Sequence, residues 1–249
     1  MRSSMGELSK EIEDEFQAGC AVLFGLRLTE QQMAQFRMYQ RLLISGNERL
    51  NLTAIIEPVD IYRKHFLDSA SLATVIGADD TARLLDVGSG AGLPGVALKI
   101  LLPDLDVTLC DALQKRVHFL QSVIAELDLQ GIRAIHGRAE DLSHDTGHRD
   151  RYDWVTARAV AQLATLVEWC LPFVKPGGRF IAMKGPDVSE EVAQASAAMA
   201  ALRAQCTGVS PYELTGGAGN RSLVVCEKLG ATPRRFPRKP GVAKRAPLS

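Results

Sequence analysis

Hydrophobic residues in the first third of the chain recur with the spacing of an amphipathic helix. Thr29 begins a Thr-x-x-Gln pattern with Gln32, which is typical of the capping box at a helix N-terminus. The apolar residues that follow recur at Met33, Phe36, Tyr39, Leu42 and Leu43. This rhythm predicts a helix with one buried face. We predict that residues 6–76 are helical.

The rhythm changes at residue 83, where short apolar runs begin to alternate with segments of helical spacing. The expected strands are Arg83–Val87, Val107–Cys110, Ile132–His136, Trp154–Ala157, Phe180–Met183 and Leu223–Cys226. The expected helices are Pro94–Leu102, Lys115–Leu127, Gln162–Val174 and Glu190–Ala204. Strands that are separated by helix-length segments pair in parallel, so the pattern predicts an α/β fold with a doubly wound, Rossmann-like sheet.

These patterns divide the chain of 249 residues into three segments. We expect residues 1–76 to form an N-terminal helical extension that packs on the core, and residues 77–230 to form the α/β domain. Residues 231–249 are rich in proline and basic side chains, and we expect them to form an extended C-terminal tail. The hydrophobic content of 46% is enough to build a core, which excludes wholesale disorder.

Charge is balanced over the whole chain but not along it. The chain has 29 Lys and Arg residues and 29 Asp and Glu residues. Residues 228–249 hold 7 of the basic residues and no acidic one, which leaves 22 basic and 29 acidic residues in the other 227 positions. A basic tail on an acidic body favours a polyanionic partner, although solvated tails are often basic without one.

Cysteine spacing and hydropathy limit the class of protein. The five cysteines are widely spaced and include no Cys-x-x-Cys pair, which favours buried free thiols over a zinc site or disulfides. No apolar run reaches the roughly 20 residues of a membrane span, and the first residues lead into a charged run rather than an apolar signal core. We expect a soluble, cytoplasmic protein without a metal site.

The strongest local motif follows the first expected strand. Residues 86–95 read Asp-Val-Gly-Ser-Gly-Ala-Gly-Leu-Pro-Gly, and glycines in such a turn let the backbone approach a ligand closely. Residues 90–95 match the dinucleotide-binding pattern G-x-G-x-x-G, and Asp111 follows where a ribose-binding acid belongs. The match alone is weak evidence for either a nicotinamide dinucleotide or S-adenosylmethionine.

Asp86 helps to separate these two cofactors. It precedes Gly88 by two residues, and we expect its carboxylate to face or lie close to the bound cofactor. A pyrophosphate would be repelled there at a cost of roughly 1–4 kcal/mol, whereas the ammonium and sulfonium groups of S-adenosylmethionine tolerate a carboxylate. Asp111 would then accept hydrogen bonds from both ribose hydroxyls. Together these residues favour S-adenosylmethionine.

Several short motifs, taken together, resemble one family. They are residues 86–95, Lys115-Arg116, Gly137-Arg138-Ala139-Glu140, Arg158-Ala159, Lys184-Gly185, Asn51-Leu52-Thr53, His65-Phe66-Leu67-Asp68-Ser69 and Arg238-Lys239-Pro240-Gly241. With this combination the chain resembles the bacterial small-subunit (16S) ribosomal RNA guanine-N7 methyltransferases, a family once named glucose-inhibited division protein B. The resemblance covers nearly the whole chain.

The resemblance implies the class I methyltransferase fold, S-adenosyl-L-methionine as cofactor and S-adenosyl-L-homocysteine as product. It also implies that 16S ribosomal RNA or the small ribosomal subunit is the partner and that N7 of a specific guanine is methylated. The cofactor contacts of the family fall, position by position, on Gly88, Leu93, Asp111, Ala139, Glu140 and Arg158. In this fold, ligands bind outside the carboxyl ends of the strands, which is where these residues are expected.

The residues themselves are compatible with N7 as the acceptor atom. After the fourth expected strand the chain reads Thr156-Ala157-Arg158-Ala159, not the Asn/Asp-Pro-Pro-aromatic segment that usually goes with methylation of an exocyclic amine. Guanine N7 has an in-plane lone pair and no proton, so we predict in-line transfer without a required general base and assign no catalytic residue. Arg158 fits either a polar contact to guanine O6 or a phosphate, or a structural salt bridge.

We expect RNA to be bound largely through its phosphates, by Lys115, Arg116 and the basic tail. His65 and Asp68 lie one helical turn apart and fit a helix-packing or capping pair as well as functional groups. Three other functions stay open: an enzyme of the same fold with a small-molecule or protein substrate, a ribosome-associated binding module with a vestigial pocket, and a nicotinamide-dependent dehydrogenase. We expect a monomer, because no apolar surface helix stands out.

Overall fold

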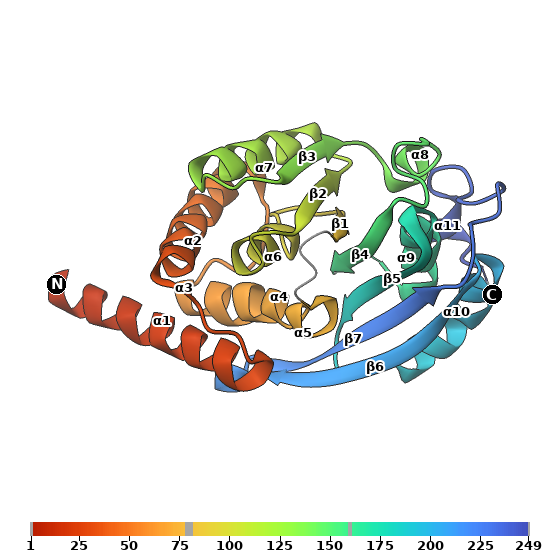
Figure 1. Ribbon diagram of the computed structural model, residues 1–249. Helices are drawn as coiled ribbons and strands as arrows, with labels where there is room; N and C mark the ends of the chain where they lie inside the picture. The colour runs from red at the N-terminus through yellow and green to blue at the C-terminus, as the bar shows by residue number, and fades with distance from the viewer. Residues whose placement is uncertain (1, 78–81, 159–160, 249) are drawn as a thin grey trace.

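The computed structural model describes residues 2–77, 82–158 and 161–248, and the side chains from residue 10 onwards within these ranges. Ala159, part of the Arg158-Ala159 motif, lies outside them. The described strands form one sheet of seven, in the order β3-β2-β1-β4-β5-β7-β6 (Figure 1). The strands are β1 (Arg83–Val87), β2 (Asp106–Asp111), β3 (Ile132–His136), β4 (Tyr152–Arg158), β5 (Val174–Lys184), β6 (Ala204–Leu214) and β7 (Gly219–Lys228).

Helices precede the sheet and cover both of its faces. The α-helices are α1 (Arg2–Phe24), α2 (Glu30–Leu50), α3 (Pro58–Ile61), α4 (Asp68–Ala70), α5 (Ala73–Ile76), α6 (Gly95–Leu101), α7 (Gln114–Glu126), α8 (Ala139–Leu142), α9 (Leu163–Cys170), α10 (Ser189–Ala201) and α11 (Val242–Arg245). A π-helix, η1 (Tyr62–Leu67), and two 3-10 turns, η2 (Leu171–Phe173) and η3 (Thr215–Gly217), complete the set. None of the described helices is long and apolar enough to cross a membrane.

Five strands of the sheet run in parallel, as predicted. β1 pairs with β2 and β4, β2 with β3, and β4 with β5, so the carboxyl ends of all five meet at one edge. Neighbouring residues of a strand face opposite sides. Leu84 accordingly joins the hydrophobic core with α2, α6 and α7, while Leu85 joins the core with α9 and α10. The α/β, doubly wound fold class is therefore confirmed.

The last two strands differ from the prediction. β7 pairs antiparallel with both β5 and β6, because β6 and β7 form a hairpin through η3 instead of a helical crossover. The prediction of parallel pairing for Leu223–Cys226 was wrong, and β6 was missed. Its residues are mostly half-buried or exposed and include Gly208 and Pro211, which weaken the sequence pattern of a strand. The helix expected up to Ala204 ends at Ala201, since Arg203 has a φ of 57°.

The N-terminal helices pack on the sheet beside the glycine-rich turn. The capping box between Thr29 and Gln32 is present, and Met33 and Phe36 are fully buried. α2 packs against α6 and α7. The Tyr39 hydroxyl, also fully buried, donates a hydrogen bond of 2.8 Å to the carbonyl of Ala91 in the glycine-rich turn. The helical extension thus supports the glycine-rich turn through this hydrogen bond from α2.

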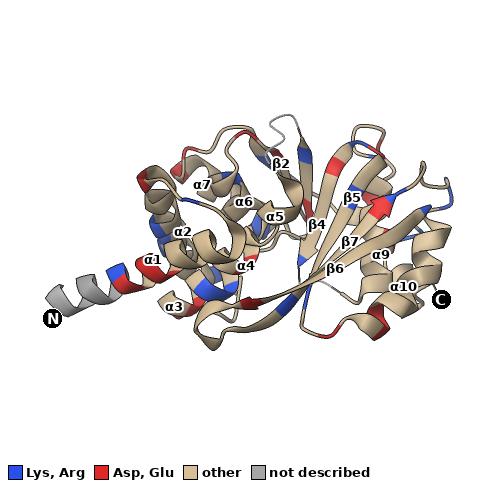
Figure 2. Ribbon diagram, turned by 60° about the horizontal axis from the view of Figure 1, so that its bottom comes forward, with Lys and Arg blue, Asp and Glu red and all other residues tan. Residues whose placement is uncertain are grey.

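The C-terminal segment is docked on the domain, so the prediction of an extended tail was wrong. Phe236 and Ala243 are 4% and 1% exposed. Arg238 forms an ion pair with Glu168 of α9, whose side chain is fully buried. Elsewhere, Lys and Arg are interspersed with Asp and Glu over helices and strands alike (Figure 2). The cysteines are free, and all but the half-buried Cys206 are buried, as expected.

The close packing of α2 against α7 at Gly46 predicts how a substitution there changes stability. Helix propensity and overpacking act in opposite directions on the free energy of unfolding. Helix propensity alone would make Gly46→Ala stabilising by about 0.5–1 kcal/mol. A Cβ at Gly46, however, would lie 2.5 Å from Cε2 of Phe119, and overpacking costs about 1–3 kcal/mol. We expect a net loss of about 1 kcal/mol in the free energy of unfolding, measured by urea denaturation. Ser45→Ala, at an exposed position of the same helix, should cause little change, and a gain in stability for Gly46→Ala would contradict the packing argument.

Candidate functional site

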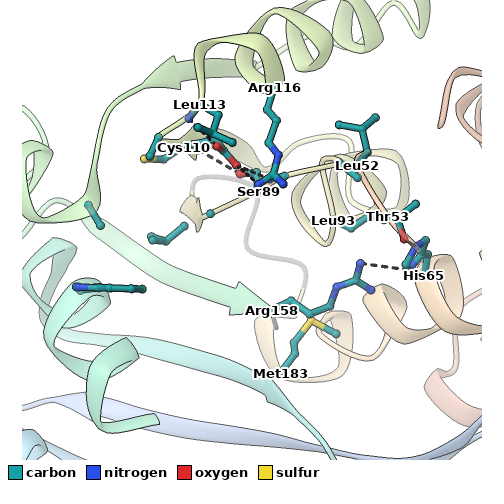
Figure 3. A pocket seen from close by; sticks show the side chains of 18 of the residues that line it. Leu52, Thr53, His65, Ser89, Leu93, Cys110, Leu113, Arg116, Arg158 and Met183 are labelled. Carbon is teal, nitrogen blue, oxygen red and sulfur yellow. Dashed lines mark hydrogen bonds and ion pairs between the residues drawn. The ribbon is translucent and has the colours of Figure 1, made fainter. Parts of the chain in front are cut away.

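A cavity of about 1010 Å³ opens at the carboxyl ends of β1 to β5. Its walls also include the loop that follows α2, the π-helix η1 and the C-terminal segment. The cavity brings together all six residues for which a cofactor contact was expected: Gly88, Leu93, Asp111, Ala139, Glu140 and Arg158. Figure 3 shows the side chains of some of the residues that line it.

The glycine-rich turn between β1 and α6 forms the floor of the cavity. Gly88, Gly90 and Gly92 have φ values of 73°, 56° and 95°, in the left-handed region that side chains rarely adopt. A Cβ at Gly92 would also lie 2.7 Å from the Tyr39 hydroxyl oxygen. The turn therefore needs glycine both for its conformation and for the close contact with α2.

Asp111, at the end of β2, joins two loops through one carboxylate. Its Oδ2 accepts a hydrogen bond of 2.9 Å from the Gly90 N–H, and its Oδ1 accepts one of 2.8 Å from the Leu113 N–H. Arg116 Nη1 lies 3.6 Å from Oδ2. The side chain is 4% exposed and lines the cavity. Each carboxylate oxygen has a second lone pair, so this carboxylate is oriented by the protein and can still accept hydrogen bonds from a ligand.

Asp86 was expected to face or lie close to the cofactor, and the structure shows that it does not face the cavity. Its side chain is fully buried, and Oδ2 accepts a hydrogen bond of 3.0 Å from the Gly95 N–H at the start of α6. It is not among the residues that line the cavity. Burial raises the pKa of Asp86 from 3.8 to about 7. Asp86 thus holds the far end of the glycine-rich turn through its bond to Gly95.

Glu140 lies where the chain leaves β3. It is 7% exposed and belongs to the short helix α8, and Ala139 next to it is 9% exposed. The Oε1 atom of Glu140 accepts a hydrogen bond of 3.1 Å from the Gly241 N–H of the C-terminal segment. Asp111 and Glu140 therefore face the cavity from the ends of neighbouring strands.

Arg158, at the end of β4, is held by the N-terminal helices. Its Nη1 donates a hydrogen bond of 3.2 Å to Oδ2 of Asp68, and its Nη2 lies 3.3 Å from Nδ1 of His65 (Figure 3). Asp68 also accepts a hydrogen bond of 2.7 Å from the Tyr212 hydroxyl. The alternative of a structural salt bridge for Arg158 is therefore observed, and the pair lies in the cavity wall.

His65 and Asp68 were expected to be a helix-packing or capping pair or functional groups, and the structure places both of them against Arg158. The Nε2 atom of His65 lies 2.9 Å from Oγ1 of Thr53, so both ring nitrogens have partners. Burial, and secondly the charge of Arg158, lower the pKa of His65 to about 3. The imidazole is neutral at physiological pH. The contacts of His65 and Asp68 with Arg158 join residues about ninety positions apart, which sequence spacing does not reveal.

The remaining candidate cations are divided between the cavity and the surface. Arg116 lines the cavity, whereas Lys115 is exposed and is not among the lining residues.

Two histidines of the loop that follows α8 have partners within the protein. His144 contacts the Pro237 carbonyl, and His148 contacts the Tyr152 hydroxyl. In the described part of the chain, no group of three or more His, Cys, Asp or Glu side chains is arranged to hold a metal ion.

Sequence comparison identifies close relatives along most of the chain. The family model described as rRNA small subunit methyltransferase G matches residues 32–215. The protein named ribosomal RNA small subunit methyltransferase G from Brevibacillus brevis is 44% identical over 224 residues, which are 90% of this chain and 94% of the relative. The protein of the same name from Desulforamulus reducens is 46% identical over 222 residues, 89% of this chain and 92% of the relative.

Solved structures share the fold at low sequence identity. A 16S rRNA (adenine(1408)-N(1))-methyltransferase variant from Catenulisporales acidiphilia is 14% identical with a TM-score of 0.51, covering 61% of this chain and 87% of its own. A SAM-dependent O-methyltransferase from Thermotoga maritima is 17% identical with a TM-score of 0.50, covering 77% of this chain and 72% of its own. At these identities, the likeness concerns the sheet and its helices.

The buried carboxyl of Asp86 gives a prediction about the pH dependence of stability. Because its pKa is raised to about 7 in the folded protein, the folded state holds a proton that the unfolded chain releases near pH 4. This contribution is complete below the unfolded pKa and is lost as the pH rises through about 7, at about 1.4 kcal/mol per pH unit. Asp86→Asn lacks this titration, so its free energy of unfolding relative to the unsubstituted protein should rise between about pH 4 and pH 7.

Urea unfolding of both proteins across this range measures the difference. Asp104→Asn serves as a control, because Asp104 is an exposed acidic residue that precedes β2. A difference for Asp86→Asn that stays constant with pH would contradict a protonated, buried carboxyl.

Proposed function

The chain belongs to the rRNA small subunit methyltransferase G family, and on this premise we propose that it transfers a methyl group from S-adenosylmethionine to N7 of a specific guanine in 16S ribosomal RNA. The observation that carries the proposal is the oriented carboxylate of Asp111 beside the glycine-rich turn, inside a cavity edged by cationic side chains.

The cavity residues suit the cofactor in shape and hydrogen bonding. Asp111 would accept hydrogen bonds from the ribose hydroxyls, because both of its oxygens keep a lone pair beyond their bonds to backbone N–H groups. Gly88 would allow close approach of the backbone, and Leu93 would cover an apolar face of the ligand. Ala139 and Glu140 would lie at the adenine end. When bound, S-adenosylmethionine supplies an electrophilic methyl group on its sulfonium.

Arg158 would lie at the other end of the cofactor site, beside the target base. Asp68 and the Lys64 carbonyl each accept a hydrogen bond from its Nη1 atom, which fixes the guanidinium plane. The Nη2 atom carries two N–H groups and contacts one acceptor, Nδ1 of His65. Its second N–H could therefore donate to a guanine O6 or a phosphate from a fixed position, without a large entropy loss. We assign Arg158 to the contact between cofactor and base.

The lining of the cavity favours a polyanionic substrate. Its acidic residues are three, Asp68, Asp111 and Glu140, and each accepts at least one hydrogen bond from the protein. Its lysines and arginines are seven: Lys64, Arg116, Arg138, Arg158, Lys184, Arg221 and Lys244. Lys64 and Lys184 are paired with Asp60 and Glu191, which lie outside the lining, so an excess of two positive charges remains. This excess attracts the phosphates of RNA.

No residue of the cavity needs to act as a general base in this reaction. Guanine N7 presents a lone pair and carries no proton, so the protein has only to hold the atom in line with the methyl group and sulfur. Orientation of this kind can supply about 7–11 kcal/mol of barrier lowering in favourable cases. The neutral imidazole of His65, with a pKa of about 3, would serve to position Arg158.

The three segments of the chain would have different roles in binding. We assign cofactor binding chiefly to residues 77–230, and contacts on the substrate side to the extension of residues 1–76, which contributes Thr53, His65 and Asp68 to the cavity. The C-terminal segment would form part of the cavity wall through Gly241 and Lys244. We propose that the protein acts on the ribosomal RNA as a monomer in the cytoplasm.

The direct test combines methyl transfer with identification of the modified atom. Small-subunit RNA and particles from cells that lack this gene are incubated with the protein and radiolabelled S-adenosylmethionine, then treated with borohydride and aniline. N7-methylguanine makes the RNA chain cleavable under these conditions, so we expect label and one new cleavage site. Label without cleavage would exclude N7, and the absence of label from every RNA would exclude an RNA substrate.

The cofactor site makes a separate prediction. Asp111→Ala removes the acceptor for the ribose and for two loop N–H groups, so the dissociation constant for S-adenosylhomocysteine should rise by about 100-fold or more. Isothermal titration calorimetry measures it, and circular dichroism verifies that the chain is folded. Asp106→Ala, on the same strand but away from the cavity, should bind like the unsubstituted protein. Equal binding by all three proteins would contradict the assignment of Asp111.

A further inference from the structure

The C-terminal segment is anchored to the domain by buried charge. Arg238 donates from Nε to Oε1 of Glu168 at 2.9 Å and from Nη2 to Oε2 at 2.6 Å, a bidentate pair. The Arg238 backbone N–H adds a third bond of 2.8 Å to Oε1. Because the Glu168 side chain is fully buried, loss of this partner would leave an uncompensated charge inside the protein.

A second set of contacts holds the chain before Arg238. Arg149 donates hydrogen bonds of 3.0 Å to the carbonyls of Phe236 and Thr232. The Nζ of Lys228, also fully buried, donates one of 2.7 Å to the Leu171 carbonyl. The chain therefore follows a fixed path from the end of β7 to Arg238, rather than extending into solvent.

This path leads the segment to the wall of the cavity. Gly241 and Lys244 line the cavity together with Glu140 and Trp169. The Gly241 N–H donates to Oε1 of Glu140 at 3.1 Å. Behind this contact, Ala243 is 1% exposed and its carbonyl accepts a hydrogen bond of 3.3 Å from Thr165 of α9. Figure 1 shows α8, α9 and α11 beside one another.

We propose that the C-terminal segment, residues 231–248, closes the adenosine end of the cofactor site and orients Glu140 for cofactor binding. This inference rests on the proposed function, in which Asp111 and Glu140 face the adenosine. Arg158 faces the cavity from the end of β4, on the other side of β1 from β2 and β3. The segment therefore contacts the half of the cavity that is remote from the methyl group.

Few of the segment's charged side chains reach the cavity. Arg238 is consumed by its pair with Glu168. The side chains of four other basic residues are exposed and do not line the cavity: Arg234, Arg235, Lys239 and Arg245. The part of the segment that reaches the cavity contributes one backbone N–H and one lysine, Lys244. The segment should therefore act on cofactor affinity first.

Gly241→Pro tests the contact with Glu140. Gly241 has a φ of 80°, which proline cannot adopt, and proline has no N–H to donate. The dissociation constant for S-adenosylhomocysteine, measured by calorimetry on the full chain, should rise by about tenfold. A second variant, Ala243→Asp, unseats α11 by a different route and should show the same direction of change.

The matched control removes charge from the segment without disturbing its docking. Arg234→Gln combined with Lys239→Gln should leave the dissociation constant unchanged, because both side chains are exposed and neither lines the cavity. Unchanged cofactor binding in both Gly241→Pro and Ala243→Asp, with the unsubstituted protein binding normally, would overturn the inference. Failure of the unsubstituted protein to bind S-adenosylhomocysteine would instead overturn the proposed function.

Discussion

The loops around the cavity depend on one constraint. Backbone N–H groups that lie outside the sheet, and so have no strand to pair with, still need hydrogen-bond acceptors. Acidic side chains at or just after the ends of three adjacent strands supply them. Asp86 accepts from Gly95, Asp111 accepts from Gly90 and Leu113, and Glu140 accepts from Gly241. Each bond ties a loop to a strand. The shape of the cavity follows from where these carboxylates lie.

The three carboxylates differ in what burial leaves available to a ligand. Asp86 is fully enclosed, and burial raises its pKa to about 7, so it supports the turn without facing the cavity. Asp111 and Glu140 are 4% and 7% exposed and line the cavity. A carboxylate that accepts a hydrogen bond from a backbone N–H thus only supports a loop on β1. After β2 and β3, the same kind of carboxylate also faces the space where a ligand would bind. Arg158 supplies the opposite charge on β4, where Asp68 holds it.

The family resemblance supplied six residues that line the cavity, and the parallel topology explains why residues so far apart in the sequence lie together. Gly88, Asp111, Ala139 and Arg158 are separated by one strand–helix unit each, and the topology alone brings them to one edge. The direction of Asp86 could not be predicted in this way, because it depends on how the turn folds back toward α6.

Contacts between distant segments were beyond the reach of local patterns. The partners of Arg158 belong to the N-terminal extension, and nothing in the spacing of His65 and Asp68 names that arginine. The docking of the C-terminal segment depends on Glu168, an acid on the buried side of α9. Glu168 interrupts the apolar face of this helix. A buried acidic residue needs a cationic partner, so this position is the sequence signal for the contact with Arg238.

The most direct test of the account is a crystal structure of the protein with S-adenosylhomocysteine. The account predicts that the ribose hydroxyls lie within hydrogen-bond distance of Asp111, that the adenine lies between Leu93 and the Ala139–Glu140 corner, and that the sulfur points toward Arg158. A ribose bound away from Asp111, or a ligand reversed so that the adenine lies beside Arg158, would contradict it.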